Sequence, residues 1–571
     1  MAPVTVHVES TQGLMARRAG VVGMAVLGSR LLGLIREQVF AIVFGAGREL
    51  DAFITAFRIP NLMRDLFAEG ALSAAFVTTF SQTLAREGEA AAWRLASLVI
   101  NALVLVVGGI MLIGIAASPL IVAWIAPGFD AIPGKTALTV EMARLMFPFL
   151  LMVALAAVAM GILDSRNVFG IPASASSFFN LGSVVGGLAC AYALAPDFVR
   201  PALGIATRTA GYAPGSQMAA RAITGMAIGT LIGGVLQFVV QIPSLRRVGF
   251  RHRAVLTLQD PGLRRVLALM APAAIGAAAV QVNVLVNNNF ASYLGNGPVS
   301  WLNVAFRFMQ LPIGLFGVAV ASVALPVVSR HAAYGDSVAM RRTIADGLEL
   351  ALLFSVPAAC GLVVLGEPVI GLIYEHGRFT AADTHEAARA LVGYAVGLAG
   401  YAGVKVVVPA FYALGDVRTP VKVSVMSIVV NYLLNWTLVR ALSFGHTGLA
   451  LSTSAVAVVN FIWLFAVLGR RLGGTDGRRL ARTLLRIAVA AVVMSFVVHG
   501  VDALLTSALS HPKGALFLGS SSLAYASRVA VGVSLGVGVF VACCWLLRLR
   551  MPMLSSWRGR PPAEERPARQ Q

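Results

Sequence analysis

Long apolar runs follow one another along almost the whole chain, and they constrain its fold more than any other feature of the sequence. Only 12% of the 571 residues are charged and 58% are hydrophobic, whereas soluble domains are about 25% charged. A helix of roughly 20 apolar residues crosses the core of a bilayer. The sequence therefore predicts an all-α polytopic membrane protein with about fourteen transmembrane helices, near residues 19–45, 53–82, 95–125, 143–163, 171–195, 222–244, 266–294, 300–328, 349–374, 388–414, 420–441, 447–469, 484–508 and 524–547.

The distribution of charge predicts how these helices are oriented. In a soluble protein, the net charge of +20 would suggest nucleic acid as a partner. With the N-terminus in the cytoplasm and one crossing at each run, roughly 28 Lys and Arg residues fall on cytoplasmic segments and about 11 outside. This asymmetry obeys the positive-inside rule, so we expect a multi-pass protein with both termini in the cytoplasm and no binding of nucleic acid.

An internal repeat predicts two halves of similar architecture. The tripeptide AFR occurs at 56–58 and again at 305–307, and Pro172 and Pro420 stand in similar contexts, so the offset is 248 or 249 residues. Internal repeats of this kind are common in transporters. We expect two six-helix pseudo-symmetric lobes, a basic cytoplasmic linker, two additional transmembrane helices and a disordered cytoplasmic tail, at residues 17–244 and 264–471, 245–263, 472–549 and 550–571 respectively.

Six cations lie inside the apolar runs, where no loop can hold them. A charge at the centre of the bilayer costs at least about 2.5–3.5 kcal/mol, so these side chains must face water, a counter-ion or an anionic ligand. Five of them fall in the first, second and eighth predicted spans, and the repeat makes the second and eighth equivalent. We therefore expect a central, hydrated cavity lined by the set Arg30, Arg36, Arg58, Arg64, Arg307 and Lys405.

The stretch FRIPNLMRDLFAEGA concentrates polar groups in the second predicted span. At 100° per residue, Arg58, Asn61, Asp65 and Glu69 share one sector of the helix. Pro60 lacks an N–H and should kink or break the helix, which leaves a half-helix N-terminus that favours an anion. This sector could line the cavity, or its arginines could pair internally, for example Arg58 with Asp65.

The surplus of arginine points to a doubly charged ligand, because the planar guanidinium fork binds phosphate through two donors. Arg307 has no acid within one turn of helix. Lys405 could face the cavity or extend its ammonium group to the membrane surface. The asparagines of two later spans could coordinate a cation or make interhelical hydrogen bonds: Asn287, Asn431 and Asn435.

Catalytic and metal-binding motifs are missing from the sequence. It contains no phosphate-binding P-loop, no zinc-ligand spacing and no credible Ser/His/Asp set. The cysteines lie in apolar runs without metal-ligand spacing: Cys190, Cys360, Cys543 and Cys544. We expect no enzyme activity, no metal and no cofactor.

The beginning of the chain resembles a known family. The stretch GSRLLGLIREQVFAIVFGAGRELDAFITAFRIPNLMRDLFAEGALSAAF, with APGF, EHGRFTAAD and VPAFYALGDVRTPVK further on, is similar to the MurJ (MviN) family of lipid II flippases. That family belongs to the multidrug/oligosaccharidyl-lipid/polysaccharide exporter (MOP) superfamily. The resemblance spans nearly the whole chain.

The resemblance implies a function in cell-wall biosynthesis and cell shape. A member would move lipid II, an undecaprenyl-pyrophosphate-linked disaccharide-peptide, from the inner to the outer leaflet of the bacterial cytoplasmic membrane by alternating access. Its partners would be lipid II, membrane lipids and, as a candidate, the cell-wall synthesis or division machinery. Moving net charge through the membrane field is worth roughly 2.3 kcal/mol per charge per 100 mV, so the membrane potential could reset the empty carrier.

The resemblance also assigns residues. The family's essential cavity arginines match Arg30, Arg36, Arg64 and Arg307, which would hold the pyrophosphate. The argument from buried charge adds Arg58 and Lys405 as candidate accessory cations. Its other functional positions match Asp51, Asn61, Glu69 and Ser300, and a groove in the last two spans would take the isoprenoid tail. The chain departs from the family at Gln310 and Phe306. Asparagines also replace the acids that form a sodium site in some members, so sodium coupling is not expected.

Alternative functions remain open at this stage. The chain could export another undecaprenyl-linked glycan, or it could be a drug antiporter of the same superfamily. An antiporter for organic cations should carry acids rather than arginines in its cavity. A polyprenyl-phosphate glycosyltransferase would need an external acidic pair, and a scaffold of the division machinery would not need costly buried arginines.

Overall fold

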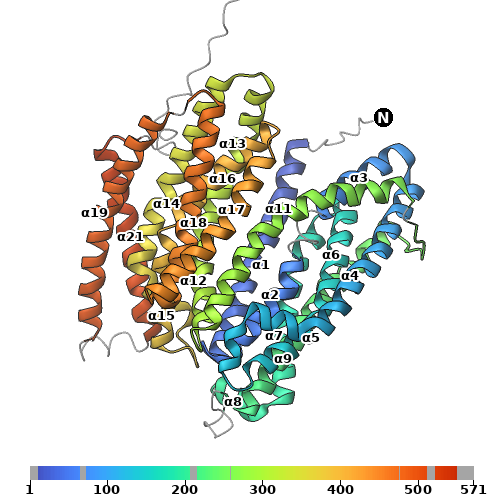
Figure 1. The fold of residues 1–571 in the computed structure, drawn as a ribbon, viewed down its shortest axis with the longest axis horizontal. Helices are drawn as coiled ribbons and strands as arrows, with labels where there is room; N and C mark the ends of the chain where they lie inside the picture. Colours follow the sequence, from blue (N-terminus) through green and yellow to red (C-terminus); the bar gives the residue numbers. More distant parts are fainter. Residues whose placement is uncertain are drawn as a thin grey trace, which may run out of the picture. The chain divides into compact units, whose positions relative to one another are not determined.

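The computed structural model describes residues 11–64, 72–205, 215–257, 259–474, 476–510 and 521–549. Helices and their connecting turns make up this part of the chain, and no described residue lies in a β-strand (Figure 1). The prediction of an all-α membrane protein is confirmed. The disordered tail predicted for 550–571 lies outside the described residues.

The helices follow one another with short connections. They are α1 (Thr11–Phe44), α2 (Arg48–Arg64), α3 (Leu72–Glu87), α4 (Glu89–Ile125), η2 (Pro127–Ala131), α5 (Lys135–Met146), α6 (Pro148–Ser165), α7 (Gly170–Leu194), α8 (Pro196–Ala202), α9 (Gln217–Val239), α10 (Ile242–Arg247), α11 (Pro261–Ser292), α12 (Pro298–Pro312), η4 (Ile313–Gly317), α13 (Val318–Ala333), α14 (Ser337–Tyr374), α15 (Ala381–Ala395), α16 (Leu398–Ala413), α17 (Arg418–Asn435), η5 (Trp436–Ala441), α18 (Gly445–Arg471), α19 (Gly477–Ser510) and α21 (Ser521–Leu546).

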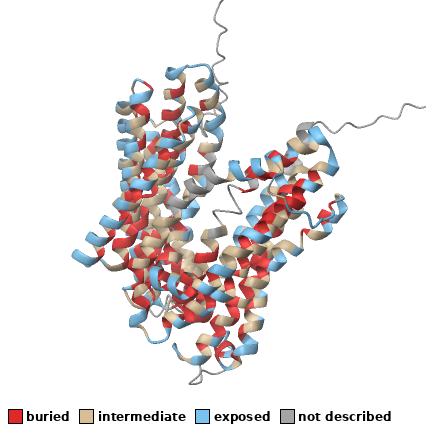
Figure 2. Cartoon of the chain, turned by 45° about the vertical axis from the view of Figure 1, so that its right-hand side comes forward, coloured by how far each residue is buried: buried red, intermediate tan, exposed pale blue. Residues whose placement is uncertain are grey.

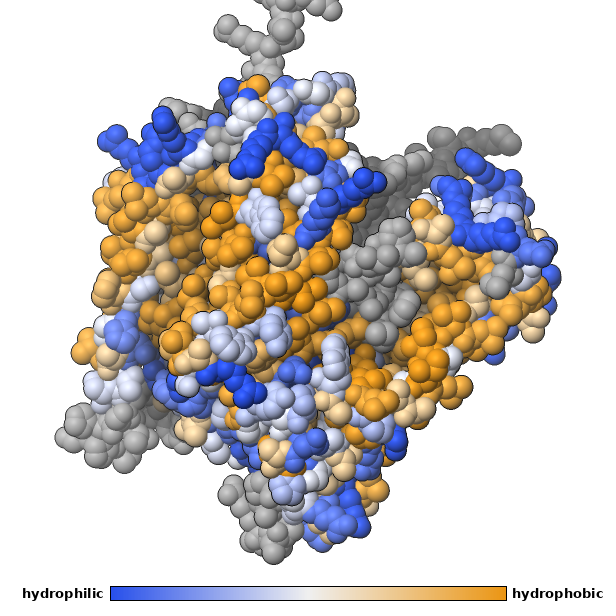
Figure 3. Space-filling model, in the orientation of Figure 1, coloured by the Kyte–Doolittle hydropathy of each residue, from blue (hydrophilic) through white to orange (hydrophobic). Residues whose placement is uncertain are grey.

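Many of these helices are long and apolar enough to cross a membrane. The described residues contain nine such helical segments, or ten if the bent pair α15 and α16 forms one span. Figure 3 shows apolar side chains along the helices and hydrophilic ones gathered toward helix ends, as expected for a bilayer environment. The prediction of about fourteen spans also counts α1, α2 with α3, α11, and α12 with α13, and that exact number stays a prediction.

The chain forms two compact units, and their boundaries differ from those of the predicted lobes. The first unit comprises Met1–Val304, Ile373–Ala387 and Ser424–Leu449, and the second comprises Ala305–Leu372, Ala388–Val423 and Ala450–Gln571. Buried residues gather inside each bundle of helices (Figure 2). The repeat-based lobes, and the lipid-tail groove expected in the last two helices, stay predictions.

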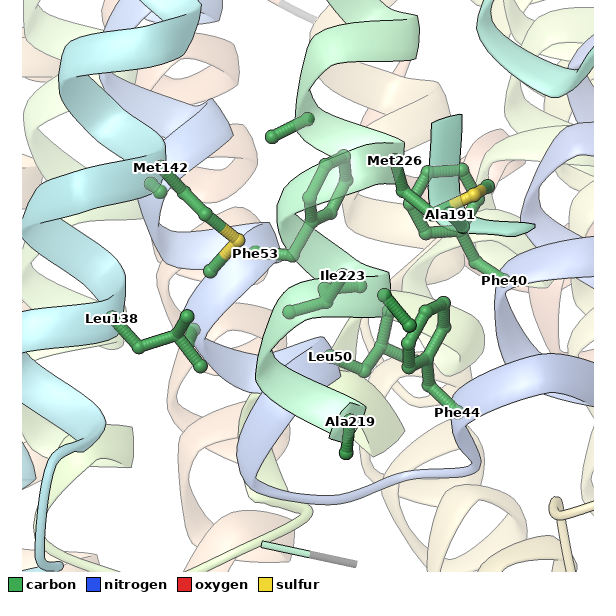
Figure 4. Close-up of a cluster of buried hydrophobic side chains, with 14 of the residues drawn as sticks. Phe40, Phe44, Leu50, Phe53, Leu138, Met142, Ala191, Ala219, Ile223 and Met226 are labelled. Atoms are coloured by element: carbon green, nitrogen blue, oxygen red, sulfur yellow. The ribbon is translucent and has the colours of Figure 1, made fainter. Parts of the chain in front are cut away.

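The core of the first unit is aromatic and aliphatic. In Figure 4, Phe40 and Phe44 of α1 pack with Phe53 of α2, Met142 of α5 and Met226 of α9. This cluster fixes the positions of α1 and α2 against the surrounding helices. These are the two helices that carry most of the predicted cavity arginines.

The predicted linker between the lobes is held against α4. Asn101 donates hydrogen bonds to the carbonyls of Arg253 (2.9 Å) and Val255 (2.8 Å). The ring centroids of Trp93 and Phe250 lie 5.7 Å apart. The segment is therefore a docked, extended strap.

Glycines allow α7 and α9 to approach closely. A Cβ atom at Gly229 of α9 would lie 2.2 Å from the Cα of Gly187 of α7. In the second unit, a Cβ at Gly403 of α16 would lie 2.4 Å from the ring of Phe461 of α18. Small residues at such crossings are typical of membrane helices, where association depends on close packing.

We expect Gly229→Ala to destabilise the first unit, because its Cβ would overlap backbone that cannot rotate away. Overpacking of this kind costs about 1–3 kcal/mol, so the thermal midpoint of the purified protein should fall. Gly109→Ala in α4 is the matched control, since a Cβ there meets nothing within 4 Å. Equal midpoints for the two variants would contradict the close packing of α7 and α9.

Candidate functional site

Asp51, one of the predicted functional residues, lies at the centre of a buried hydrogen-bond network. Its carboxylate accepts hydrogen bonds from the backbone N–H of Gly297 (2.7 Å) and Ser300 (2.9 Å) and from the Ser300 hydroxyl (2.7 Å). These donors belong to the N-terminus of α12, where unpaired N–H groups and the helix dipole favour a negative charge. Asp51 of α2 therefore caps α12.

Lys135, at the start of α5, completes this network. Its ammonium group lies 3.0 Å from the Asp51 carboxylate and also donates to the Gly295 carbonyl (3.2 Å) and the Asn296 side-chain oxygen (3.0 Å). Both charged side chains are 0% exposed. Removing one partner of a buried ion pair typically costs about 3–5 kcal/mol, because the other charge is left uncompensated. We call Asp51, Lys135 and Ser300 with their partners the Asp51 network.

A second contact joins the loop after α14 to the turn between α1 and α2. The Arg378 N–H donates to the Ile42 carbonyl (2.9 Å), and Gln38 of α1 donates to the Ile373 carbonyl (2.7 Å). Gly45 and Gly377 have φ angles of 67° and 62°. A Cβ at Gly377 would lie 2.4 Å from the Ile42 oxygen, and one at Gly45 would lie 2.6 Å from the Arg378 oxygen. We call this the Gly45–Gly377 contact.

We expect Gly377→Ala to loosen this contact, because its Cβ would meet backbone and its φ angle is strained for alanine. The strained backbone alone costs about 1–3 kcal/mol, and this cost lowers the free energy of local opening. Amide hydrogen exchange at Arg378 should therefore accelerate about tenfold or more. Gly415→Ala is the control: its φ angle is 73°, and its Cβ would meet nothing within 4 Å. The same exchange rate in both variants would count against the contact.

The predicted arginines of the first unit lie on α1 and α2. The Arg36 guanidinium is half-buried and lies over the rings of Phe179 (5.2 Å) and Phe57 (5.9 Å), with Glu37 3.7 Å away. Such cation–π contacts position a guanidinium without occupying its N–H donors. Arg58 donates to the Val284 carbonyl at 3.5 Å.

The remaining predicted residues are placed as follows. Arg30 is exposed on α1, and Arg64 and Asn61 are partly exposed on α2. Asp65 and Glu69 lie outside the described residues, and so does the proposed pairing of Asp65 with Arg58. In the second unit, Arg307 of α12 and Lys405 of α16 are both exposed, and the convergence of cations from both halves stays a prediction.

The asparagines singled out in the sequence hydrogen-bond to one another. Asn431 and Asn435 of α17 both donate to the side-chain oxygen of Asn287 of α11, at 3.0 and 2.8 Å. This geometry is what the interhelical alternative expects. Among the described residues there is no group of three or more His, Cys, Asp or Glu side chains that could hold a metal. A cation site at the asparagines stays a prediction.

Two parts of this arrangement could not be read from the sequence. Lys135 lies in a segment that looks like an ordinary external loop, so no sequence signal marks it as a buried partner of Asp51. Gly377 falls in the motif EHGRF. This motif contributes to the family resemblance, but it does not predict which residue the glycine contacts. The arginines of α1 and α2 are suited to bind an anion. The Asp51 network and the Gly45–Gly377 contact lie where these two helices join, at the end of α1 and the beginning of α2.

Comparison with known proteins gives a consistent result. The family model described as "Lipid II flippase MurJ" matches residues 40–516. A lipid II flippase MurJ of Burkholderia cenocepacia is 34% identical over 82% of this chain and 87% of its own length. A probable lipid II flippase MurJ of Rhizobium meliloti is 35% identical over 92% of this chain and 94% of its own length.

Solved structures agree with the sequence relatives. The structure described as "Lipid II flippase MurJ, inward closed conformation" is similar with a TM-score of 0.70 and 25% identity, over 93% of this chain and 99% of that one. An inward-facing multidrug resistance MATE family transporter of the MOP superfamily matches with a TM-score of 0.63 and 15% identity, over 80% of this chain and 96% of that one. The second similarity concerns the fold alone.

Proposed function

This chain belongs to the lipid II flippase MurJ family, and we propose that it moves lipid II from the inner to the outer leaflet of the bacterial cytoplasmic membrane for peptidoglycan synthesis. It is a transporter, and its action needs no bond to be made or broken in the substrate. The observation that carries the proposal, beside the family, is the set of four arginines on α1 and α2.

The pyrophosphate of lipid II is the group these arginines would bind. Each guanidinium can give two parallel N–H bonds to a phosphate, and charge-assisted bonds are roughly twice as strong as neutral ones. Arg36 is already oriented by the rings of Phe57 and Phe179, so it loses little freedom on binding. Arg30 and Arg64 of the same two helices would complete this anion site, and the resemblance assigns Arg307 of α12 to the pyrophosphate as well.

The Asp51 network and the Gly45–Gly377 contact would form the closed extracytoplasmic gate. The positive-inside prediction places both of them outside. In alternating access, the headgroup would enter the cationic cavity from the cytoplasm while the isoprenoid tail stays in the bilayer. Release outside would require both contacts to open. Because the carrier moves positive charge, the membrane potential could supply roughly 2.3 kcal/mol per charge per 100 mV to reset it.

Depletion of this chain from its cells tests the function. We expect lipid II to accumulate in the inner leaflet and the cells to lyse, because the precursor no longer reaches the outer face. Lipid II at that face is measured by its reaction with an impermeant reagent. Re-expression should restore it. Accumulation of a different undecaprenyl-linked glycan, with lipid II unchanged, would favour the alternative exporter.

A further inference from the structure

The first turn of α12 extends the Asp51 network to a further side chain of the same unit. Gly297 and Ser300 donate their backbone N–H groups to the Asp51 carboxylate. Trp301 follows Ser300 in the chain, and its backbone N–H donates to the Gly297 carbonyl (2.9 Å). The Trp301 indole is therefore attached directly to the turn that Asp51 caps, and it moves with that turn.

The Trp301 indole is held by packing. Gly297 has a φ angle of 104°, and a Cβ atom there would lie 2.5 Å from the indole ring, so a glycine is needed for the ring to cover this turn. At the beginning of α18, the centroid of the His446 ring lies 5.1 Å from that of the Trp301 ring. An indole N–H that is taken out of water needs a hydrogen-bond acceptor, and the indole finds one on α15.

Asp383 of α15 joins this indole to the loop that follows α14. Its Oδ1 atom accepts the Trp301 indole N–H (3.0 Å). Its Oδ2 atom accepts both the backbone N–H and the hydroxyl of Thr380, each at 2.9 Å. The Asp383 N–H donates back to the Thr380 hydroxyl (3.3 Å), which completes a capping box at the start of α15. The two oxygens of one carboxylate thus hold two different segments.

The capping box continues into the Gly45–Gly377 contact. Only one residue, Phe379, separates Thr380 from Arg378, the residue whose N–H donates across that contact. Phe379 is 2% exposed. Because a closely packed interior transmits displacements, this short segment cannot shift at Arg378 without pulling on Thr380 and on the Asp383 carboxylate.

Both contacts hold the short turn between α1 and α2. Ile42 lies before this turn and accepts the Arg378 N–H, and Asp51 lies after it and binds the first turn of α12. Trp301 and Asp383 join the outer partners of the two contacts to each other. Opening one contact alone would stretch this junction, so joint opening is favoured.

We infer that Trp301 and Asp383 are positioning residues that couple the Asp51 network to the Gly45–Gly377 contact, so that the two open together. Coupling of this kind needs a physical element that both sites bias, and the divided carboxylate of Asp383 is that element. Its role in transport rests on the proposed function, in which both contacts must open before the headgroup is released outside. Joint opening would make that release a single step.

Amide hydrogen exchange on the purified, substrate-free full chain tests the coupling. Gly377→Ala alters one contact, and we expect it to accelerate exchange about tenfold both at Arg378 and, in the other contact, at Ser300. Trp301→Phe removes the indole N–H and keeps a ring. In that background, Gly377→Ala should still accelerate exchange at Arg378 but change it at Ser300 by about twofold or less. General loosening by Trp301→Phe would not remove only the response of the distant amide.

Trp124→Phe is the matched control. It makes the same chemical change at a side chain that is 67% exposed, so the response of Ser300 to Gly377→Ala should stay about tenfold. Asp383→Asn is the second variant, in case the Trp301 variant does not fold. An amide has one acceptor oxygen and cannot serve both partners of the carboxylate, so the same loss of response is expected.

Two results would overturn the coupling. One is an unchanged exchange rate at Ser300 in Gly377→Ala, and the other is an equal acceleration at Ser300 with and without Trp301→Phe. Because the carrier is empty in this experiment, neither result bears on which lipid it moves. Lipid II that still reaches the outer face after depletion would instead refute the proposed function and leave the coupling intact.

Discussion

Replacing Arg36 with alanine is expected to abolish the appearance of lipid II at the outer face of the membrane while protein levels stay normal. Arg36 is half-buried on α1 and is held by the rings of Phe57 and Phe179. Its loss would remove a bidentate contact to the pyrophosphate. At about 1.5–3 kcal/mol for each bond to a charged group, two such bonds correspond to roughly a hundredfold loss or more.

Two further variants make this result specific. Arg36→Lys keeps the charge but loses the planar fork, so we expect it to restore only part of the transport. Arg94→Ala removes an exposed arginine of α4 and should leave transport unchanged. We expect Arg30→Ala and Arg307→Ala to behave like Arg36→Ala. Normal translocation by these three alanine variants would refute the anion site.

The second large effect is expected in the Asp51 network, and it should be asymmetric. Asp51→Leu leaves the fully buried ammonium group of Lys135 without its counter-charge, so it should lose about 3–5 kcal/mol of stability. Lys135→Met should cost less, because Asp51 keeps three hydrogen bonds from the N-terminus of α12. Denaturant or thermal unfolding of the purified variants measures both effects.

The double variant Asp51→Leu/Lys135→Met distinguishes a buried ion pair from ordinary packing. Without either charge, it should be more stable than Asp51→Leu alone, since no isolated charge remains buried. If the double variant instead loses the sum of the two single losses, the side chains act independently. Lower stability of the Asp51 network should also raise the accessibility of this region to an impermeant reagent from outside.

The architecture could be predicted because the bilayer leaves few choices. Apolar runs of about 20 residues must form helices that satisfy their own backbone, and the structure has helices throughout the described residues. The arginines were found for a related reason: a cation in an apolar run is costly, so Arg30, Arg36 and Arg64 stood out as functional candidates. The motifs around them also resembled the family that the comparisons then identified.

The amino-acid sequence by itself determined the membrane-embedded helical class, the cationic helices α1 and α2, and the family. Only the tertiary structure decided which polar groups close against one another. Asp51 meets Lys135 across 84 residues and Ser300 across 249 residues, and Gly377 lies against Ile42 in the last turn of α1. The hydrophobicity of a segment depends only on its own residues, so a membrane helix can be predicted from the local sequence. A pairing between distant segments depends on how the helices pack, and the type of a residue does not identify the residue that it will contact.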